Sequence, residues 1–137
     1  MAKKPNLLIY EEQKFNVGQD TFIDSVADNG NAVVFEDNEE TGYFYAVDPV
    51  GTFSILDALQ IYNVANVIDK NEPSLVKILW NETESKAFLS INNYYHAVYD
   101  FGERVGLCRT GFPNSNGSWT KNEDRKLTDE LVKELAK

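Results

Sequence analysis

The sequence contains one cysteine, Cys108, and one histidine, His96, and each scarcity excludes a kind of chemistry. A single cysteine cannot form a disulfide within the chain, so the fold has no need of an oxidising compartment. A single histidine excludes a metal site built from several imidazoles. We therefore predict neither a disulfide nor a metal centre.

Long apolar runs are also missing. A membrane-spanning helix needs about 20 predominantly apolar residues, and no segment of this chain approaches that length. Near the N-terminus, Lys3 and Lys4 precede only four apolar residues before Glu11. That run is too short for the apolar core of a secretory signal. We predict a cytoplasmic protein with no membrane partner.

Sequence signatures of common catalytic and cofactor sites are absent. No Gly-x-x-x-x-Gly-Lys or Gly-x-Gly-x-x-Gly pattern is available to bind phosphate, and no Gly-x-Ser-x-Gly motif presents a nucleophilic serine. A Cys108–His96 pair oriented by Asp100 can be written, but strand spacing puts Asp100 about 13 Å from His96. We predict no catalytic residues and no cofactor, and we favour a protein that is not an enzyme.

What the sequence does contain is typical of one globular domain. It has 137 residues, of which 42% are hydrophobic and 26% are charged. This length is sufficient for one hydrophobic core, so we predict a single domain over residues 1–137. Eight Phe, seven Tyr and two Trp supply the large side chains that suit a core rich in β-sheet.

Alternating and β-branched segments predict six strands. Their expected ranges are residues 20–27, 32–35, 43–47, 75–80, 87–91 and 94–101. Turn-forming residues separate neighbouring strands at Asp28–Asn31 and at Asn92–Asn93. In the third strand, Tyr43 and Tyr45 are expected on one face and Phe44 on the other. The first three strands should form a meander.

Residues 54–63 change from a strand period to a helical one. The tetrapeptide from Ser54 to Asp57 resembles a capping box, and Asp57, Gln60 and Asn63 recur at every third position. This pattern predicts a central helix that is buried on most of its surface.

A second helix is predicted at the C-terminus. Another capping box spans Thr120–Glu123, and an apolar stripe follows it at Leu127, Leu131, Val132 and Leu135. The predicted fold is therefore α+β. It has a mainly antiparallel sheet of about six strands, one buried central helix and one C-terminal helix packed on the sheet.

The net charge of −9 is concentrated early in the chain. Residues 11–48 contain ten acidic residues and one lysine, Lys14, which gives −9 within this segment alone. Such a field repels phosphates, so we expect no nucleic-acid partner. A basic protein surface is the better candidate, although acidic loops also serve simply to keep a fold soluble.

The centre of the acidic segment is the candidate partner-binding surface. Its carboxylates do not have the spacing of a calcium-binding loop. They suit attraction of a basic partner, and the nearby tyrosines supply anchoring area. The candidate residues are Glu36, Asp37, Glu39, Glu40, Tyr43 and Tyr45.

An alternative hypothesis places a small-molecule pocket, or a modest enzyme activity, near His96. Strand alternation puts Tyr94 and Val98 on the same face as His96. Arginines in the following loop could clamp an anion, although such arginines also pair with nearby acids. The residues of this pocket are Tyr94, His96, Arg104 and Arg109.

Two stretches, Val33–Ala46 and Ile55–Val64, resemble a small family of uncharacterised bacterial proteins. The resemblance extends over residues 20–101 and implies a bacterial origin, with no assigned activity and no functional residues to carry over. Our first hypothesis is a non-enzymatic, acidic protein-interaction module. One form of it is an immunity-type protein that neutralises a basic partner. The sequence does not determine the oligomeric state.

Overall fold

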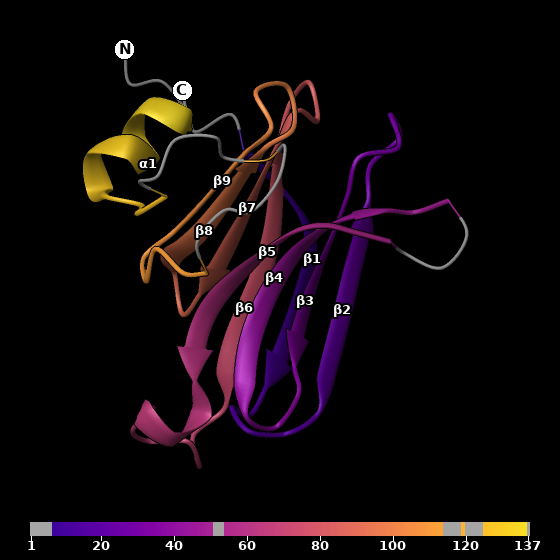
Figure 1. Ribbon diagram of the computed structural model, residues 1–137. Coiled ribbons are helices and arrows are strands. Elements are labelled where there is room, and N and C mark those ends of the chain that lie inside the picture. Colours follow the sequence, from indigo (N-terminus) through magenta and orange to yellow (C-terminus); the bar gives the residue numbers. More distant parts are fainter. Residues whose placement is uncertain (1–6, 51–53, 114–118, 120–124, 137) are drawn as a thin grey trace.

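The computed structural model describes residues 7–50, 54–113, 119 and 125–136. In these residues, nine strands form two antiparallel sheets, and one α-helix follows them (Figure 1). The elements are β1 (Leu7–Phe15), β2 (Thr21–Val26), β3 (Ala32–Asp37), β4 (Thr41–Asp48), β5 (Ser54–Asn63), the 3-10 turn η1 (Val64–Asn66), β6 (Ser74–Asn81), β7 (Lys86–Ile91), β8 (Tyr94–Asp100), β9 (Val105–Cys108) and α1 (Asp129–Leu135).

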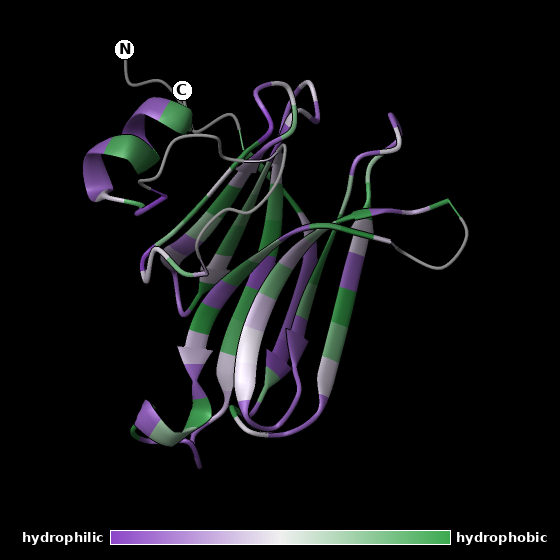
Figure 2. Cartoon of the chain, viewed as in Figure 1, coloured by the Kyte–Doolittle hydropathy of each residue, from purple (hydrophilic) through white to green (hydrophobic). Residues whose placement is uncertain are grey.

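The two sheets pack face to face. One has five strands in the order β1-β6-β7-β8-β9, and the other has four in the order β2-β3-β4-β5. Strand β1 lies near β2 at one side of the molecule, and β5 lies near β9 at the other. Alternate residues of each strand therefore face either the other sheet or the outside. Figure 2 shows this alternation as bands of hydropathy along the strands.

The main core lies between the sheets. Ile23, Phe35 and Phe44 face it from the four-stranded sheet, and Ile78 and Trp80 face it from the five-stranded sheet. Two hydrogen bonds cross this core: Tyr99 Oη donates to the carbonyl of Phe44 (2.7 Å), and Trp80 Nε1 donates to Ser25 Oγ (2.9 Å). Because a buried hydroxyl or indole N–H needs a hydrogen-bond partner, these two bonds favour the observed alignment of the two sheets.

A second apolar cluster lies on the outer side of the five-stranded sheet. Phe88 and Val98 of that sheet pack with Leu127, and the helix α1 contributes Val132 and Leu135. The helix begins after Thr128, whose side chain accepts a hydrogen bond from the Leu131 backbone N–H (3.2 Å). In Figure 1, α1 lies beside β8 and β9 and away from the four-stranded sheet.

The predicted central helix is wrong, because residues 54–63 form strand β5. The pairing of β4 with β5 skips one residue of β5 at Leu56 and another at Ile61. Each such bulge shifts the alternation of the strand by one residue. Asp57 and Gln60 lie between the two bulges and pair with Ala46 and Tyr43, which are on opposite faces of the sheet, so their spacing of three residues is not the polar stripe of a helix. The fold is therefore largely β and not α+β.

The other elements divide between confirmed and missed. All six predicted strands are present as β2, β3, β4, β6, β7 and β8, and the structure adds β1, β5 and β9. The C-terminal helix is also present, but it begins at Asp129, and the predicted capping box at Thr120–Glu123 lies outside the described residues. Within the part of the chain that the structure describes, no helix has the length and hydropathy required to cross a bilayer.

Candidate functional site

The outer side of the four-stranded sheet forms a regular array of side chains. Residues directly opposite one another in paired strands share a face, and the register of β2 to β5 puts three rows of four residues on the side away from the core. We call this array the outer face. Its rows are Phe22, Glu36, Tyr43 and Gln60; Asp24, Val34, Tyr45 and Ala58; and Val26, Ala32, Val47 and Ile55.

The outer face has a buried apolar centre and exposed apolar margins. Val34 and Val47, on the two central strands, are only 2% and 3% exposed. Phe22 on β2 and Ile55 on β5 are 57% and 61% exposed. No helix among the described residues covers this face, whereas α1 covers the outer side of the other sheet. Large exposed apolar residues gathered on one face are typical of an interaction surface.

Two tyrosines and one carboxylate form a group at one end of the outer face. The rings of Tyr43 and Tyr45 are stacked, with centroids 5.5 Å apart and planes inclined by 18°. Tyr45 Oη donates a hydrogen bond to Glu36 Oε1 (3.2 Å). Burial, followed by the charge of Glu36, raises the pKa of Tyr45 well above its usual value, so the phenol stays protonated and donating. We call Glu36, Tyr43 and Tyr45 the tyrosine–glutamate cluster.

The four-stranded sheet carries no positive charge of its own. Residues 15–69, which include all of β2 to β5, contain ten acidic residues and no lysine, arginine or histidine. The basic residues belong to the termini, to the five-stranded sheet and to the segments that adjoin it. The two carboxylates of the outer face, those of Asp24 and Glu36, therefore have no cation from their own sheet beside them, which favours a cationic partner.

The candidate partner-binding residues separate into three groups. Glu36, Tyr43 and Tyr45 lie together on the outer face, and of these only the shared face of Tyr43 and Tyr45 was predicted. Glu39 and Glu40 are exposed in the turn between β3 and β4.

Asp37 does not belong to the surface at all. Its side chain is fully buried and accepts hydrogen bonds from Tyr62 Oη (2.6 Å), the Gly18 N–H (2.8 Å) and the Glu39 N–H (2.8 Å). Since Asp37 follows Glu36 on a strand, it points to the opposite face. Its role is structural, and its inclusion among the partner-binding residues was wrong.

The acidic segment as a whole is not one patch. Glu11 and Glu12 lie on β1 in the other sheet, and Asp28 and Asp48 lie at the end of the four-stranded sheet opposite to Glu39. The carboxylates next to the buried apolar centre of the outer face are those of Asp24 and Glu36. The interaction hypothesis is thereby narrowed to the outer face.

The structure brings together three of the four residues of the alternative pocket. The Arg109 guanidinium lies 4.4 Å above the Tyr94 ring, and the Tyr94 and His96 rings meet edge to face at 5.0 Å. Arg109 also donates to the Tyr95 carbonyl (2.9 Å) and pairs with Asp129 of α1 (2.9 Å). These contacts tie β8, the loop after β9 and α1 to one another.

Arg104 is separate from this group. It lies in the turn between β8 and β9, whereas Tyr94 begins β8. Seven residues of strand span roughly 20 Å. The predicted sharing of one face by His96 and Val98 is also wrong, because the β7–β8 pairing skips a residue at His96 and groups Tyr95 with Val98 on the outer side.

His96 predicts a measurable pH dependence of stability. Burial, followed by the charge of Arg109, lowers the pKa of His96 from 6.5 to about 4. The unfolded chain therefore takes up a proton at a higher pH than the folded chain does. The stability due to neutral His96 is complete above pH 6.5 and is lost as the pH falls toward 4. We expect a loss of about 2 kcal/mol between pH 7 and pH 4.5 that His96→Gln does not show.

The measurement is urea unfolding of the wild type and of His96→Gln at the two pH values. The difference between the two proteins isolates the histidine from the carboxylates, which titrate in both. A difference that does not change with pH would contradict a buried neutral imidazole.

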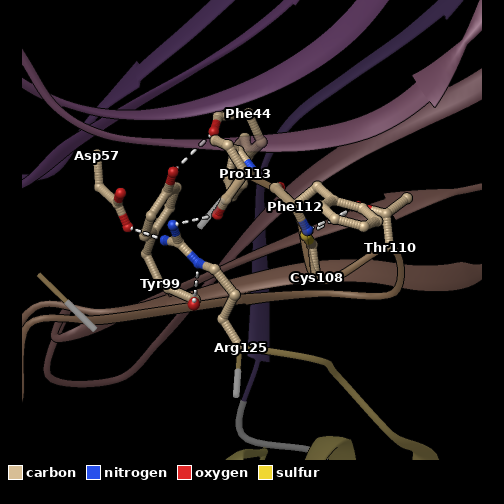
Figure 3. A network of polar contacts seen from close by, with 9 residues as sticks. Phe44, Asp57, Tyr99, Cys108, Thr110, Phe112, Pro113 and Arg125 are labelled. Carbon is tan, nitrogen blue, oxygen red and sulfur yellow. Dashed lines mark hydrogen bonds and ion pairs between the residues drawn. The ribbon is translucent and has the colours of Figure 1, made fainter. Parts of the chain in front are cut away.

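A buried polar network joins the two sheets where β5 meets β9, and sequence analysis missed it (Figure 3). The Arg125 side chain, 1% exposed, forms an ion pair with Asp57 of β5. It also donates to the carbonyls of Gly106 (3.3 Å) and Pro113 (2.9 Å). Burial raises the pKa of Asp57, and the Arg125 guanidinium opposes that rise. Arg125 lies in a run of charged residues, so no local signal predicted its burial.

Cys108 belongs to the same region and is fully buried. Its sulfur contacts Thr110 Oγ1 (3.3 Å) and donates to the Phe112 carbonyl (3.4 Å). Thr110 in turn donates to the Gln60 carbonyl (2.7 Å), so the loop after β9 is attached to β5. The contacts around this cysteine are those of a packed structural residue. Among the described residues, no three His, Cys, Asp or Glu side chains converge as metal ligands do.

Comparison with known proteins adds the family to this geometry. Residues 15–136 match the family model DUF2251, described as an uncharacterized protein conserved in bacteria. The chain belongs to this family. A Haemophilus influenzae relative, named only as an uncharacterized protein, is 41% identical over 95 residues, which are 67% of this chain and 59% of the relative. This chain thus matches less than two thirds of that relative's length, and no solved structure matches it significantly.

The bacterial family agrees with the resemblance predicted from Val33–Ala46 and Ile55–Val64. The structure shows what these two stretches of the DUF2251 chain have in common. They supply most of β3, β4 and β5, which are three of the four strands that carry the outer face. The family match includes all of these strands.

Proposed function

We propose that this DUF2251 protein is a protein-interaction module that binds a basic protein through the outer face. The observation that carries the proposal is that exposed apolar side chains on one face of a sheet, those of Phe22, Val26 and Ile55, lie in a segment, residues 15–69, with no positive charge. Apolar margins supply contact area, and carboxylates select a partner with the opposite charge. An immunity-type protein that neutralises a basic partner is one form of this function.

The charge of the outer face also restricts the class of partner. A second copy of the chain would bring two anionic faces together, and like charges across an interface oppose association. Nucleic acid and anionic lipid surfaces are repelled for the same reason. A partner with lysine or arginine around an apolar patch satisfies both the charge and the exposed Phe22 and Ile55.

The test is affinity capture from a lysate of the source bacterium with wild type, Phe22→Ser and Ile68→Ser. Phe22 and Ile68 are both exposed, at 57% and 82%, but Ile68 lies outside the outer face, so the two variants are matched in chemistry and differ in place. We expect a protein of basic isoelectric point to be retained by the wild type and by Ile68→Ser, and at least about tenfold less by Phe22→Ser.

Salt supplies a second criterion. Raising the ionic strength from about 0.15 M to about 1 M shortens the screening length from roughly 8 Å to roughly 3 Å. The same partner should then be released from the wild type. Equal capture by Phe22→Ser and Ile68→Ser, or capture that does not depend on salt, would exclude the outer face as the binding surface.

A further inference from the structure

We infer that the tyrosine–glutamate cluster is a receptor for an arginine side chain of the partner, whose guanidinium lies over a tyrosine ring and pairs with Glu36. This inference rests on the proposed function and names the chemistry of its central contact. Three observations support it: the arrangement of the aromatic rings, the hydrogen bonding of the carboxylate, and a matching contact elsewhere in this chain.

The rings and the carboxylate are arranged for a planar cation. Tyr43 and Glu36 are directly opposite in the register of β3 and β4, so both project from the same face. Tyr43 and Tyr45 are stacked at 5.5 Å and are half-buried, so each ring is packed against the other while part of the pair reaches solvent. An aromatic face attracts a cation through its quadrupole, and arginine does this more often than lysine.

Glu36 has capacity for one more strong hydrogen bond. Its Oε1 accepts from Tyr45 Oη (3.2 Å), and among the described residues Glu36 forms no ion pair. The hydroxyl of Tyr45 fixes the carboxylate beside the rings. A guanidinium above the ring could therefore direct an N–H to Oε2, and such charge-assisted bonds are stronger than neutral ones.

The chain contains the same contact, already satisfied, on its other sheet. There the Arg109 guanidinium lies 4.4 Å above the Tyr94 ring and pairs at 2.9 Å with the carboxylate of Asp129. The ring, the carboxylate and the cation all come from one chain. At Tyr43 the ring and the carboxylate are present, but residues 15–69 contain no cation to complete the set. Among the described residues no cation is paired with Glu36 or placed over the Tyr43 ring, so a cation of the partner can take this position.

Arginine fits this place better than lysine does. Its guanidinium is planar, is weakly hydrated and carries donors in a fixed fork, so it can stack on a ring and bond to a carboxylate at the same time. A lysine ammonium is a compact, strongly hydrated charge and gains less from the ring face. The two cations therefore give different predictions for a binding experiment.

The experiment titrates the protein with the peptide acetyl-Gly-Arg-Gly-amide and follows the tyrosine ring resonances by NMR. The lysine and citrulline versions of the peptide are the ligand controls, since citrulline keeps the shape of arginine and removes the charge. We expect the arginine peptide to shift the rings of Tyr43 and Tyr45, the lysine peptide to bind more weakly, and the citrulline peptide to leave them unchanged.

Matched variants separate a built receptor from general attraction. Glu36→Gln and Glu40→Gln each remove one negative charge, but only Glu36 contacts the rings. We expect Glu36→Gln and Tyr43→Leu each to weaken binding about fivefold and Glu40→Gln to change it less than about twofold. Equal weakening by Glu36→Gln and Glu40→Gln, equal binding of citrulline, or unshifted rings with the arginine peptide would each overturn the inference.

Capture of the native partner distinguishes this inference from the proposed function. A partner that is lost with Phe22→Ser but fully retained with Glu36→Gln would contradict the arginine receptor and still support binding through the outer face. A partner retained with both variants would contradict the proposed function itself. Loss with both variants, with retention by Glu40→Gln, supports the two together.

Discussion

Replacing Arg125 with methionine is expected to lower the free energy of unfolding by about 3–5 kcal/mol at pH 7. Methionine keeps much of the apolar length but removes the cation from a site where the arginine is 1% exposed. Asp57 would then be a partly buried carboxylate without its counter-ion, and the carbonyls of Gly106 and Pro113 would lose a donor. Losing one partner of a buried pair costs far more than the pair itself contributes.

The size of this effect should depend on pH. Burial already raises the pKa of Asp57 while Arg125 opposes the rise, so removal of Arg125 raises that pKa further. A raised carboxyl pKa in the folded state means that stability decreases as the pH rises through it. The defect of Arg125→Met should therefore be complete at pH 7 and smaller near about pH 4, where Asp57 can be protonated in both states.

A double variant is the control for this interpretation. Asp57→Leu combined with Arg125→Met replaces the ion pair by apolar side chains, and we expect it to be more stable than Arg125→Met alone. Urea unfolding of the two single variants and the double variant gives the coupling energy. A double variant as unstable as the sum of the singles would show that Asp57 and Arg125 do not act as a pair.

Replacing Asp37 with alanine is expected to cost about 3–5 kcal/mol of stability. Asp37 is fully buried and accepts three hydrogen bonds, from Tyr62, Gly18 and Glu39. Alanine would remove the acceptor of all three hydrogen bonds, which are partly buried. Asp37→Asn keeps one acceptor oxygen and should lie between wild type and alanine.

The neighbouring carboxylate supplies the comparison. Glu40 is exposed in the same turn, so Glu40→Ala should change stability by less than about 0.5 kcal/mol. The measurement is thermal or urea unfolding of the three variants. If Asp37→Ala is as stable as Glu40→Ala, the buried hydrogen bonds of Asp37 do not organise the turn, and its assignment as a structural residue fails.

The predicted strands do not all show the same burial pattern. Strands β2 and β4 alternate along most of their length, whereas β3 and β7 are buried at nearly every residue and carry the β-branched and aromatic side chains typical of strands. In β5, two bulges interrupt the alternation of the strand. In β1, every residue between Leu7 and Phe15 is exposed, so burial imposes no pattern on the sequence. Alternation alone does not locate every strand, because the four residues of β9 alternate between half-buried and buried positions and were still missed.

The placement of the candidate residues was predicted in part from strand alternation. Alternation correctly placed Tyr43 and Tyr45 on one face, and the strand parity of Val33, Phe35 and Asp37 contained the signal that Asp37 faces inward. That signal was missed because the strand was expected to end at Phe35. Phe22 and Ile55 could not be assigned to the same surface from the sequence, since they lie 33 residues apart. They share a face only because four strands pair in register.

The sequence alone shows that every charged residue within 15–69 is acidic. It also predicts the positions of six strands and of a helix near the C-terminus. Packing between distant segments decides which carboxylates reach solvent and which apolar side chains of the outer face stay exposed. It also buries Arg125 against Asp57. Charge and alternation are properties of neighbouring residues. Burial depends on register between strands and on contacts such as that between residues 57 and 125, which no local pattern specifies.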